Sequence, residues 1–128
     1  MVVGNPQSIS PDAAVHRIGG GTLPNLRLKP QEAAKNPPGI SVLLGGTPQD
    51  AARQMRAAYP RATRLHALAA VVGTATAEAI RQAGFEVIPD PSRRLPNHAC
   101  IIHPQGVAGF DDANLALLSQ VFQDTTGC

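Results

Sequence analysis

Four short apolar runs, each bounded by turn-forming residues, recur along the chain and predict β-strands. These runs lie at residues 14–18, 40–44, 85–88 and 99–102. In the first run, alternation sends His16 and Ile18 to one face of the strand and their neighbours Val15 and Arg17 to the other. One of His16 and Arg17 can therefore face a cleft. The second run is almost entirely apolar, and Ser41 is its only polar side chain.

Helix signals separate these strands. Thr47 is a suitable N-cap and Pro48 fits the first helical position, so we expect a helix from Pro48 to about Ala58. Further helices are expected over residues 62–71, from residue 74 or 76 to 83, and over 113–122, with a helical turn at 30–34 and a short edge strand at 25–29. Because strands and helices are segregated along the chain, the order predicts an α+β fold and not alternating βαβ units.

The length bounds the domain organisation. A chain of 128 residues fits a single domain with its own hydrophobic core. Residues 1–12 carry no periodic pattern, so we expect a flexible N-terminal segment, and we expect the tail at residues 123–128 to fray.

Charge and composition exclude several classes of protein. The formal charge is only +2 and the acidic residues are dispersed, so we expect binding neither to nucleic acid nor to an anionic membrane. No apolar run is long enough to span a membrane and no secretion signal of the usual kind is present, which favours a cytoplasmic location. The histidines and the cysteines Cys100 and Cys128 lack zinc-finger spacing, so no metal site is expected.

The loop from Pro89 to His98 connects two predicted core strands and carries the densest chemistry of the chain. Three prolines fix its path, while Arg93, Arg94 and His98 are presented from it. A stiff polar loop between core strands is a common place for a binding site. The alternative interpretation is a soluble turn with no site.

Three blocks of the sequence resemble a known family. An arginine with a neighbouring histidine lies in an early strand, the block PGISV forms the next strand, and VIPDPSRRLPNHACIIHP follows late in the chain. Together they resemble small bacterial ADP-ribosyltransferase-like toxins typified by a type VI secretion effector. This resemblance implies a split mixed or antiparallel sheet flanked by helices. It also implies that NAD binds in a cleft of the sheet and that its ADP-ribose is transferred to an unknown acceptor.

The resemblance assigns roles to individual residues. Arg17, with His16 beside it, would contact the NAD cofactor, and Ser41 would position the nicotinamide ribose. His98 would lie near the bond that breaks, and Arg93 and Arg94 would add cofactor contacts from the same loop.

The late block departs from the family pattern because it lacks the usual glutamate. Either Glu86 or Asp90 substitutes for that carboxylate, or catalysis is feeble, or there is none. Glu32 is a further candidate for acid or base chemistry, although each of these carboxylates can equally be a surface charge.

A second function remains open from the sequence. In this hypothesis the chain is a non-catalytic binding or regulatory module whose Pro89–His98 loop contacts a protein partner. That partner would be a neutralising protein, whereas an enzyme would contact a protein acceptor. Convergence of Arg17, Ser41 and His98 on one cleft would favour the enzyme.

Overall fold

Six strands form one antiparallel sheet in a computed structural model that describes residues 9–127. The sheet order is β4-β5-β2-β1-β3-β6, and every neighbouring pair is antiparallel. The strands are β1 (Ala14–Ile18), β2 (Ile40–Leu44), β3 (Val71–Thr76), β4 (Glu86–Pro89), β5 (His98–Ile102) and β6 (Gln123–Thr126). The α+β class is confirmed, and the sheet is antiparallel, not mixed. Residues 1–8 of the expected flexible segment, and Cys128, lie outside the described residues.

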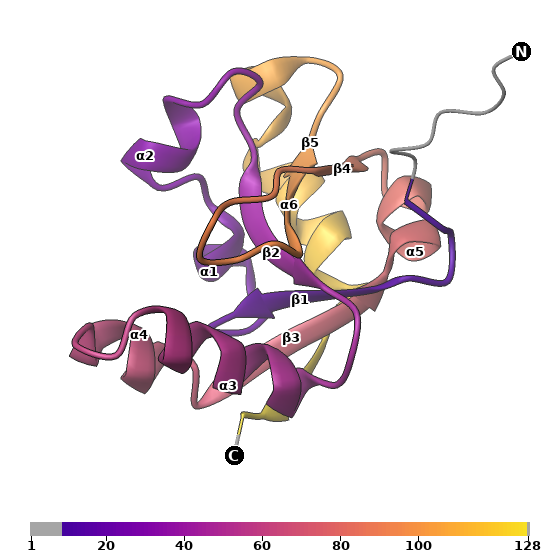
Figure 1. Ribbon diagram of the computed structural model, residues 1–128. Coiled ribbons are helices and arrows are strands. Elements are labelled where there is room, and N and C mark those ends of the chain that lie inside the picture. Colours follow the sequence, from indigo (N-terminus) through magenta and orange to yellow (C-terminus); the bar gives the residue numbers. More distant parts are fainter. Residues whose placement is uncertain (1–8, 128) are drawn as a thin grey trace, which may run out of the picture.

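The contact between β1 and β2 is the shortest stretch of pairing in the sheet. These strands pair only where Val15 lies opposite Leu44 and His16 opposite Leu43, whereas β1 pairs with β3 along its whole length. Beyond His16 the two strands diverge, and β2 runs across the direction of β1 (Figure 1). The sheet therefore opens between two halves, β4-β5-β2 and β1-β3-β6.

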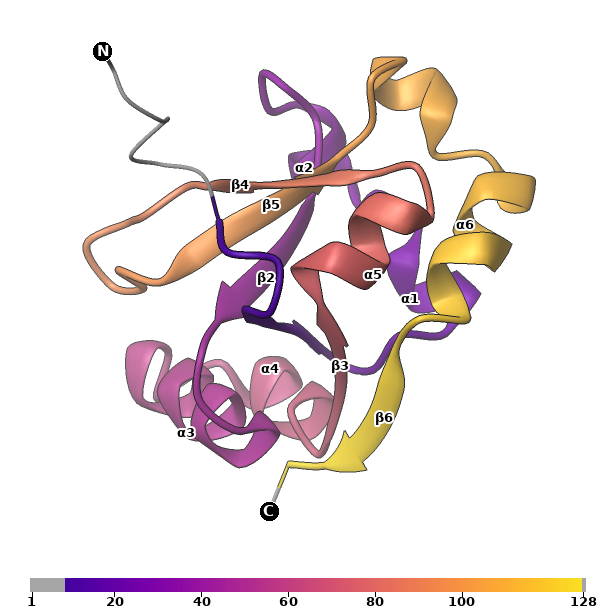
Figure 2. The same cartoon turned by 90° about the vertical axis from the view of Figure 1, so that its right-hand side faces the viewer.

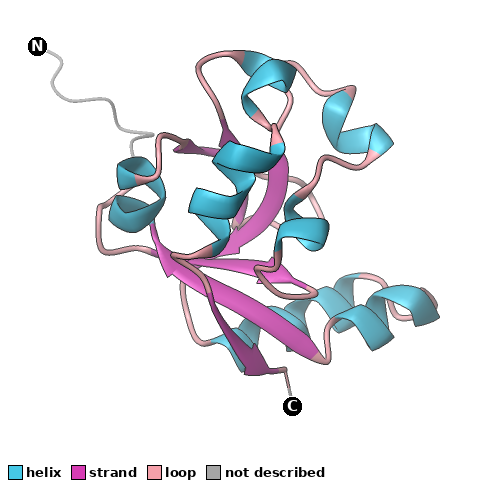
Figure 3. Cartoon of the chain, turned by 180° about the vertical axis from the view of Figure 1, so that it is seen from behind, coloured by secondary structure: helices cyan, strands magenta, loops and turns pink. Residues whose placement is uncertain are grey.

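Helices cover both faces of the sheet (Figures 2 and 3). They are α1 (Leu23–Leu26), α2 (Pro30–Ala33), α3 (Pro48–Ala58), α4 (Thr63–Leu68), α5 (Ala77–Gln82) and α6 (Asp112–Ser119), with a 3₁₀ turn at Gly106–Gly109. One core lies between the sheet and α5 and α6, where Val15 and Ile40 pack with Leu118. A smaller core on the opposite face joins Leu43 to Ala52 of α3. Within residues 9–127, no helix is long and apolar enough to cross a membrane.

Local signals explain where the helices begin and end. The bounds predicted for α3 are confirmed, because Thr47 and Asp50 form a reciprocal cap: each side chain accepts a hydrogen bond from the other residue's backbone N–H at 3.0 Å. The Thr76 hydroxyl accepts from the backbone N–H of Ala79 and starts α5. Gly84 follows α5 with a φ of +95°, a left-handed conformation that favours glycine.

Several expectations were wrong. Residues 25–29 do not form an edge strand, because Pro24 starts the short helix α1 at Leu23. The helix expected over 62–71 ends at Leu68, and the β-branched residues from Val71 form β3. The tail at 123–128 is not frayed along its length, because β6 pairs with β3.

The described part of the expected flexible segment, residues 9–12, contacts the domain. Ile9 is buried in the larger core, and the carbonyl oxygen of Pro11 accepts a hydrogen bond from the N–H of Glu78 at 2.8 Å. These contacts join the start of β1 to α5.

Candidate functional site

A pocket of about 420 Å³ lies where β1 and β2 diverge, a volume within the usual range for small-molecule sites. Its walls come from both strands, from α2, α3 and α4, and from the β4–β5 loop. The apolar lining consists of Ile18, Val42, Leu43, Met55, Tyr59, Leu65, Leu68, Pro91 and Leu95. The polar lining consists of Arg17, Lys29, Gln31, Glu32, Lys35, Ser41, Asp90, Ser92 and His98. The pocket thus joins an apolar wall to a set of charged and hydrogen-bonding groups.

The pocket brings together three of the residues predicted from the sequence. Arg17, Ser41 and His98 come from three distant segments, and all of them line it. The Ser41 hydroxyl has no hydrogen-bond partner among residues 9–127, so it is available to a ligand. Ser41 and His98 also share one face of the sheet, because Ser41 lies opposite Cys100 and Leu43 lies opposite His98.

Three other predicted residues do not line the pocket. His16 is fully buried, and its ring nitrogens bond to the Thr74 hydroxyl and to backbone carbonyls. Arg93 is exposed and lies outside the pocket lining. The Arg94 guanidinium lies 5.2 Å from the centre of the Tyr59 ring and donates a hydrogen bond to the carbonyl oxygen of Ala58. It therefore supports the pocket wall from behind.

Arg17 fills the gap between the diverging strands. Its Nε and one terminal nitrogen donate to the carbonyl oxygen of Asn25, at 3.1 and 2.7 Å. The other terminal nitrogen donates to the carbonyl oxygen of Ser41 at 2.9 Å and to the Glu32 carboxylate at 2.8 Å. Four of the five guanidinium N–H groups are thus used. The bidentate phosphate contact expected for Arg17 needs two free N–H groups, so it cannot form in this arrangement.

Glu32 completes this buried network, although it was one of the candidates for acid or base chemistry. Its carboxylate accepts hydrogen bonds from the backbone N–H groups of Ser41 and Lys29, both at 2.9 Å, in addition to Arg17. Burial acts to raise the pKa of Glu32, but the charge of Arg17 and these hydrogen bonds outweigh burial and hold the pKa below its usual range. Glu32 is therefore ionised, and it ties α2 to β1 and β2.

His98 is held by the residue that faces it across the β4–β5 hairpin. Its Nδ1 lies 2.9 Å from the backbone carbonyl oxygen of Asp90 and 3.3 Å from the Asp90 carboxylate. Because a carbonyl oxygen only accepts, Nδ1 carries the proton and Nε2 keeps its lone pair. Burial lowers the pKa of His98, so the ring is neutral near pH 7. Nε2 has no hydrogen-bond partner in the described part of the chain, and a neutral histidine with such a nitrogen is suited to accept a proton from a ligand.

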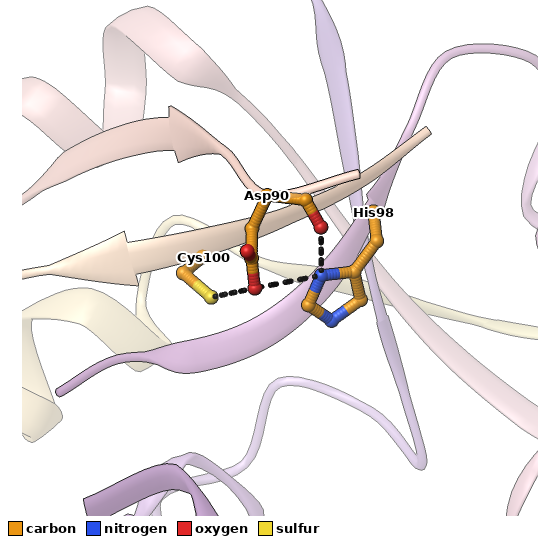
Figure 4. A group of neighbouring side chains, drawn as sticks. All are labelled: Asp90, His98 and Cys100. Carbon is orange, nitrogen blue, oxygen red and sulfur yellow. Dashed lines mark hydrogen bonds and ion pairs between the residues drawn. The ribbon is translucent and has the colours of Figure 1, made fainter. Parts of the chain in front are cut away.

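Asp90, His98 and Cys100, which we term the Asp90 cluster, lie together (Figure 4). Asp90 and His98 of this cluster line the pocket. The Cys100 sulfur lies 3.5 Å from Asp90 Oδ2, and the Lys35 ammonium donates to the same oxygen at 3.0 Å. The hydrogen bond from Lys35 holds the pKa of Asp90 below its usual range, so this carboxylate is ionised. Burial raises the pKa of Cys100 to about 11. The cluster offers oxygen, nitrogen and sulfur donors, all of which bind transition metals.

The structure distinguishes between the two carboxylates that could substitute for the missing glutamate. Asp90 lines the pocket, whereas Glu86 lies outside the lining and bonds to the Nε of Arg81 at 2.6 Å. Asp90 is therefore the better placed of the two.

Sequence reasoning missed the two lysines of the pocket. Lys29 was expected at the end of an edge strand, and Lys35 was given no role. Both line the pocket, because α2 and its flanking residues fold over the opening between β1 and β2. A sequence signal existed: Pro30 follows Lys29 and fits the first position of a helix that places Lys29 and Lys35 at its two ends.

The pocket is therefore built from residues that come from most of the chain. The buried Arg17–Glu32 pair and the two lysines Lys29 and Lys35 line it, as do Asp90 and His98 of the Asp90 cluster. Comparisons of the chain with protein-family models, with curated proteins and with solved structures found no match.

Proposed function

We propose that this chain binds NAD in the pocket and transfers the ADP-ribose group to an acceptor. The observation that carries the proposal is that Arg17, Ser41 and His98, each from a different block of the resemblance, line one pocket. The opening between β1 and β2 also agrees with the split sheet that the resemblance implies.

The lining suits a ligand that combines flat rings with phosphate groups. Met55, Leu65 and Leu68 offer apolar surface for a ring. Lys29 offers positive charge for the pyrophosphate, which Arg17 cannot supply because Glu32 and two carbonyl oxygens already hold its guanidinium. Lys35 also lines the pocket, but its ammonium is paired with Asp90. The free hydroxyl of Ser41 is suited to a ribose.

Asp90 and His98 would act at the end of NAD where the bond to nicotinamide breaks. When bound, NAD supplies a glycosidic bond that breaks to release nicotinamide, while the acceptor takes the ADP-ribose. The ionised carboxylate of Asp90 would stabilise positive charge that develops on the ribose, which is the task of the glutamate absent from the late block. The neutral Nε2 of His98 would accept the proton of the acceptor.

The position of the Pro89–His98 loop favours this function over a protein-binding module. Pro91, Ser92 and Leu95 of the loop line the pocket, and Arg94 rests on Tyr59 of α3. Most of the loop is thus committed to the pocket wall.

Calorimetry with NAD, followed by measurement of nicotinamide release, tests the proposal. Lys29→Gln should weaken NAD binding about tenfold to a hundredfold, because it removes a charge-assisted contact. Asp90→Asn should reduce turnover more than binding, because its carboxylate acts chiefly on the transition state. Arg93→Ala is the matched control, since Arg93 is a cation outside the pocket, and it should change neither quantity. If millimolar NAD neither binds nor releases nicotinamide, the proposal fails.

A further inference from the structure

Three chemically different metal-binding groups meet at the β4–β5 hairpin. His98 and Cys100 occupy alternate positions of β5, so their side chains lie on the same face of the sheet. Asp90 follows β4 and lies across from His98, because the N–H of Asp90 donates to the carbonyl oxygen of His98 at 2.9 Å. We propose that Asp90, His98 and Cys100 form a zinc-binding site beside the pocket, an inference that does not rest on the binding of NAD.

Two of the three donor-to-donor distances within the Asp90 cluster match the edges of a tetrahedral zinc site. Zinc binds sulfur at about 2.3 Å and histidine nitrogen and carboxylate oxygen at about 2.0 to 2.1 Å, which gives tetrahedral edges of about 3.5 Å between sulfur and oxygen and about 3.3 Å between nitrogen and oxygen. In the structure, Cys100 Sγ lies 3.5 Å from Asp90 Oδ2, and His98 Nδ1 lies 3.3 Å from the same oxygen. All three donor atoms lie within 4.8 Å of one another. Two of the three edges are thus already formed.

A positive charge already occupies this position. The Lys35 ammonium lies 3.0 Å from Asp90 Oδ2 and 3.5 Å from Cys100 Sγ, so it contacts two of the atoms that the metal would use. The Lys35 side chain is one-third exposed and lines the pocket, and the rotatable bonds of its four-carbon stem allow the ammonium other positions. A zinc ion and the ammonium therefore compete for the same oxygen and sulfur, and Lys35 compensates the Asp90 charge while the metal is absent.

The donor set selects the metal. Sulfur and nitrogen donors favour zinc over magnesium or calcium, which prefer oxygen. On binding, the thiol proton of Cys100 passes to solvent, and the ring proton of His98 moves from Nδ1 to Nε2 by exchange with water, so the ring stays neutral. One thiolate and one carboxylate then balance the two positive charges of zinc. The fourth coordination position is left to water or to a pocket ligand, as in open zinc sites.

Metal titration of the full chain tests the site. All variants carry Cys128→Ser, so that Cys100 is the only thiol. Calorimetry with Zn²⁺ alone should give one ion per chain. Co²⁺ should give an absorption band from thiolate-to-metal charge transfer, together with the intense visible bands of a tetrahedral ion. Cys100→Ser should remove the charge-transfer band, and Asp90→Asn and His98→Gln should each weaken binding by at least about tenfold to a hundredfold.

Lys35→Met is the decisive variant, because it leaves all three ligands in place. Loss of the competing ammonium should tighten zinc binding about twofold to fivefold, which corresponds to a partly exposed ion pair. His66→Gln is the matched control, since His66 lies outside the cluster and bonds to the carbonyl oxygen of Tyr59. It should leave the affinity unchanged.

Two results would overturn the site. One is a cobalt spectrum of the chain with all three ligands present that lacks the thiolate band. The other is zinc affinity that neither falls with Asp90→Asn nor rises with Lys35→Met, which would mean an adventitious ion only. Neither measurement uses NAD, so the failure of the zinc site is distinguishable from the failure of the proposed transferase. Asp90→Asn and Lys35→Met alter partly exposed side chains, so neither variant changes the buried core.

Discussion

Replacement of Glu32 by alanine should destabilise the domain more than removal of any exposed charge. Glu32 is 3 % exposed and Arg17 is 4 % exposed. The carboxylate accepts three hydrogen bonds, and those from Arg17 and from the Ser41 N–H tie α2 to β1 and β2. Glu32→Ala leaves the guanidinium of Arg17 buried without its counter-charge. Removing one partner of a buried pair costs about 3 to 5 kcal/mol of the free energy of unfolding.

That loss is large for a chain of this size. With an unfolding entropy of about 2 cal/mol/K per residue, the melting temperature should fall by roughly 10 to 20 °C. Urea unfolding followed by circular dichroism, together with thermal melts, gives both quantities. Glu32→Gln should be nearly as destabilising, because it removes the charge and turns an amide N–H toward groups that are already donors.

The exposed pair between Arg27 and Asp112 provides the matched control. Both side chains are more than half exposed, so Arg27→Ala should cost less than about 1 kcal/mol. If Glu32→Ala also changes the free energy of unfolding by less than about 1 kcal/mol, the Arg17–Glu32 pair does not hold the two strands as described.

Three further predictions concern the core and the sheet. Leu118 is fully buried in α6, so Leu118→Ala should lower the free energy of unfolding by about 2 to 5 kcal/mol, and an unchanged urea midpoint would show that α6 is not docked. A Cβ at Gly73 would lie 2.5 Å from the backbone nitrogen of Gly21, so Gly73→Ala should cost at least about 1 kcal/mol in the same assay; equal stability would contradict this close approach. Burial lowers the pKa of His16 from its ordinary value of 6.5, so the unfolded chain takes up the proton more readily. Stability should therefore be full above pH 6.5 and decline as the pH falls below it, and His16→Gln should remove part of this slope; identical slopes would refute the assignment.

Local signals predicted the elements whose ends are fixed by neighbouring residues. The bounds of α3 follow from Thr47, Asp50 and Pro48, and those of β1 and β2 follow from apolar runs next to glycines. These bounds depend on residues that are close in sequence or on strands with strong apolar patterns. Arg17, Ser41 and His98, by contrast, come from distant segments, and the fold brings them to the lining of one pocket.

The features that the sequence did not predict depend on contacts between distant segments. β6 is polar and carries no apolar pattern, and its pairing with β3 defines it. β3 lies between two alanine-rich helices, so the sequence pattern divides its residues between the end of one predicted helix, a break at Gly73 and the start of the next. The spacing of His98 and Cys100 is visible in the sequence, but the approach of Asp90 depends on the register of β4 against β5. The engagement of Arg17 by Glu32 likewise depends on α2 folding over the sheet.

The short pairing of β1 with β2 also predicts where the native domain opens. Only two residue pairs join the two halves of the sheet, so partial unfolding should separate these halves before either half melts. Ser41, Asp90 and His98 belong to one half and Arg17 to the other, so the pocket exists only while they are joined. In native-state hydrogen exchange, amides at this junction should exchange through a low-energy opening that a pocket ligand suppresses. Slow exchange there would then report occupancy of the pocket, whatever the ligand.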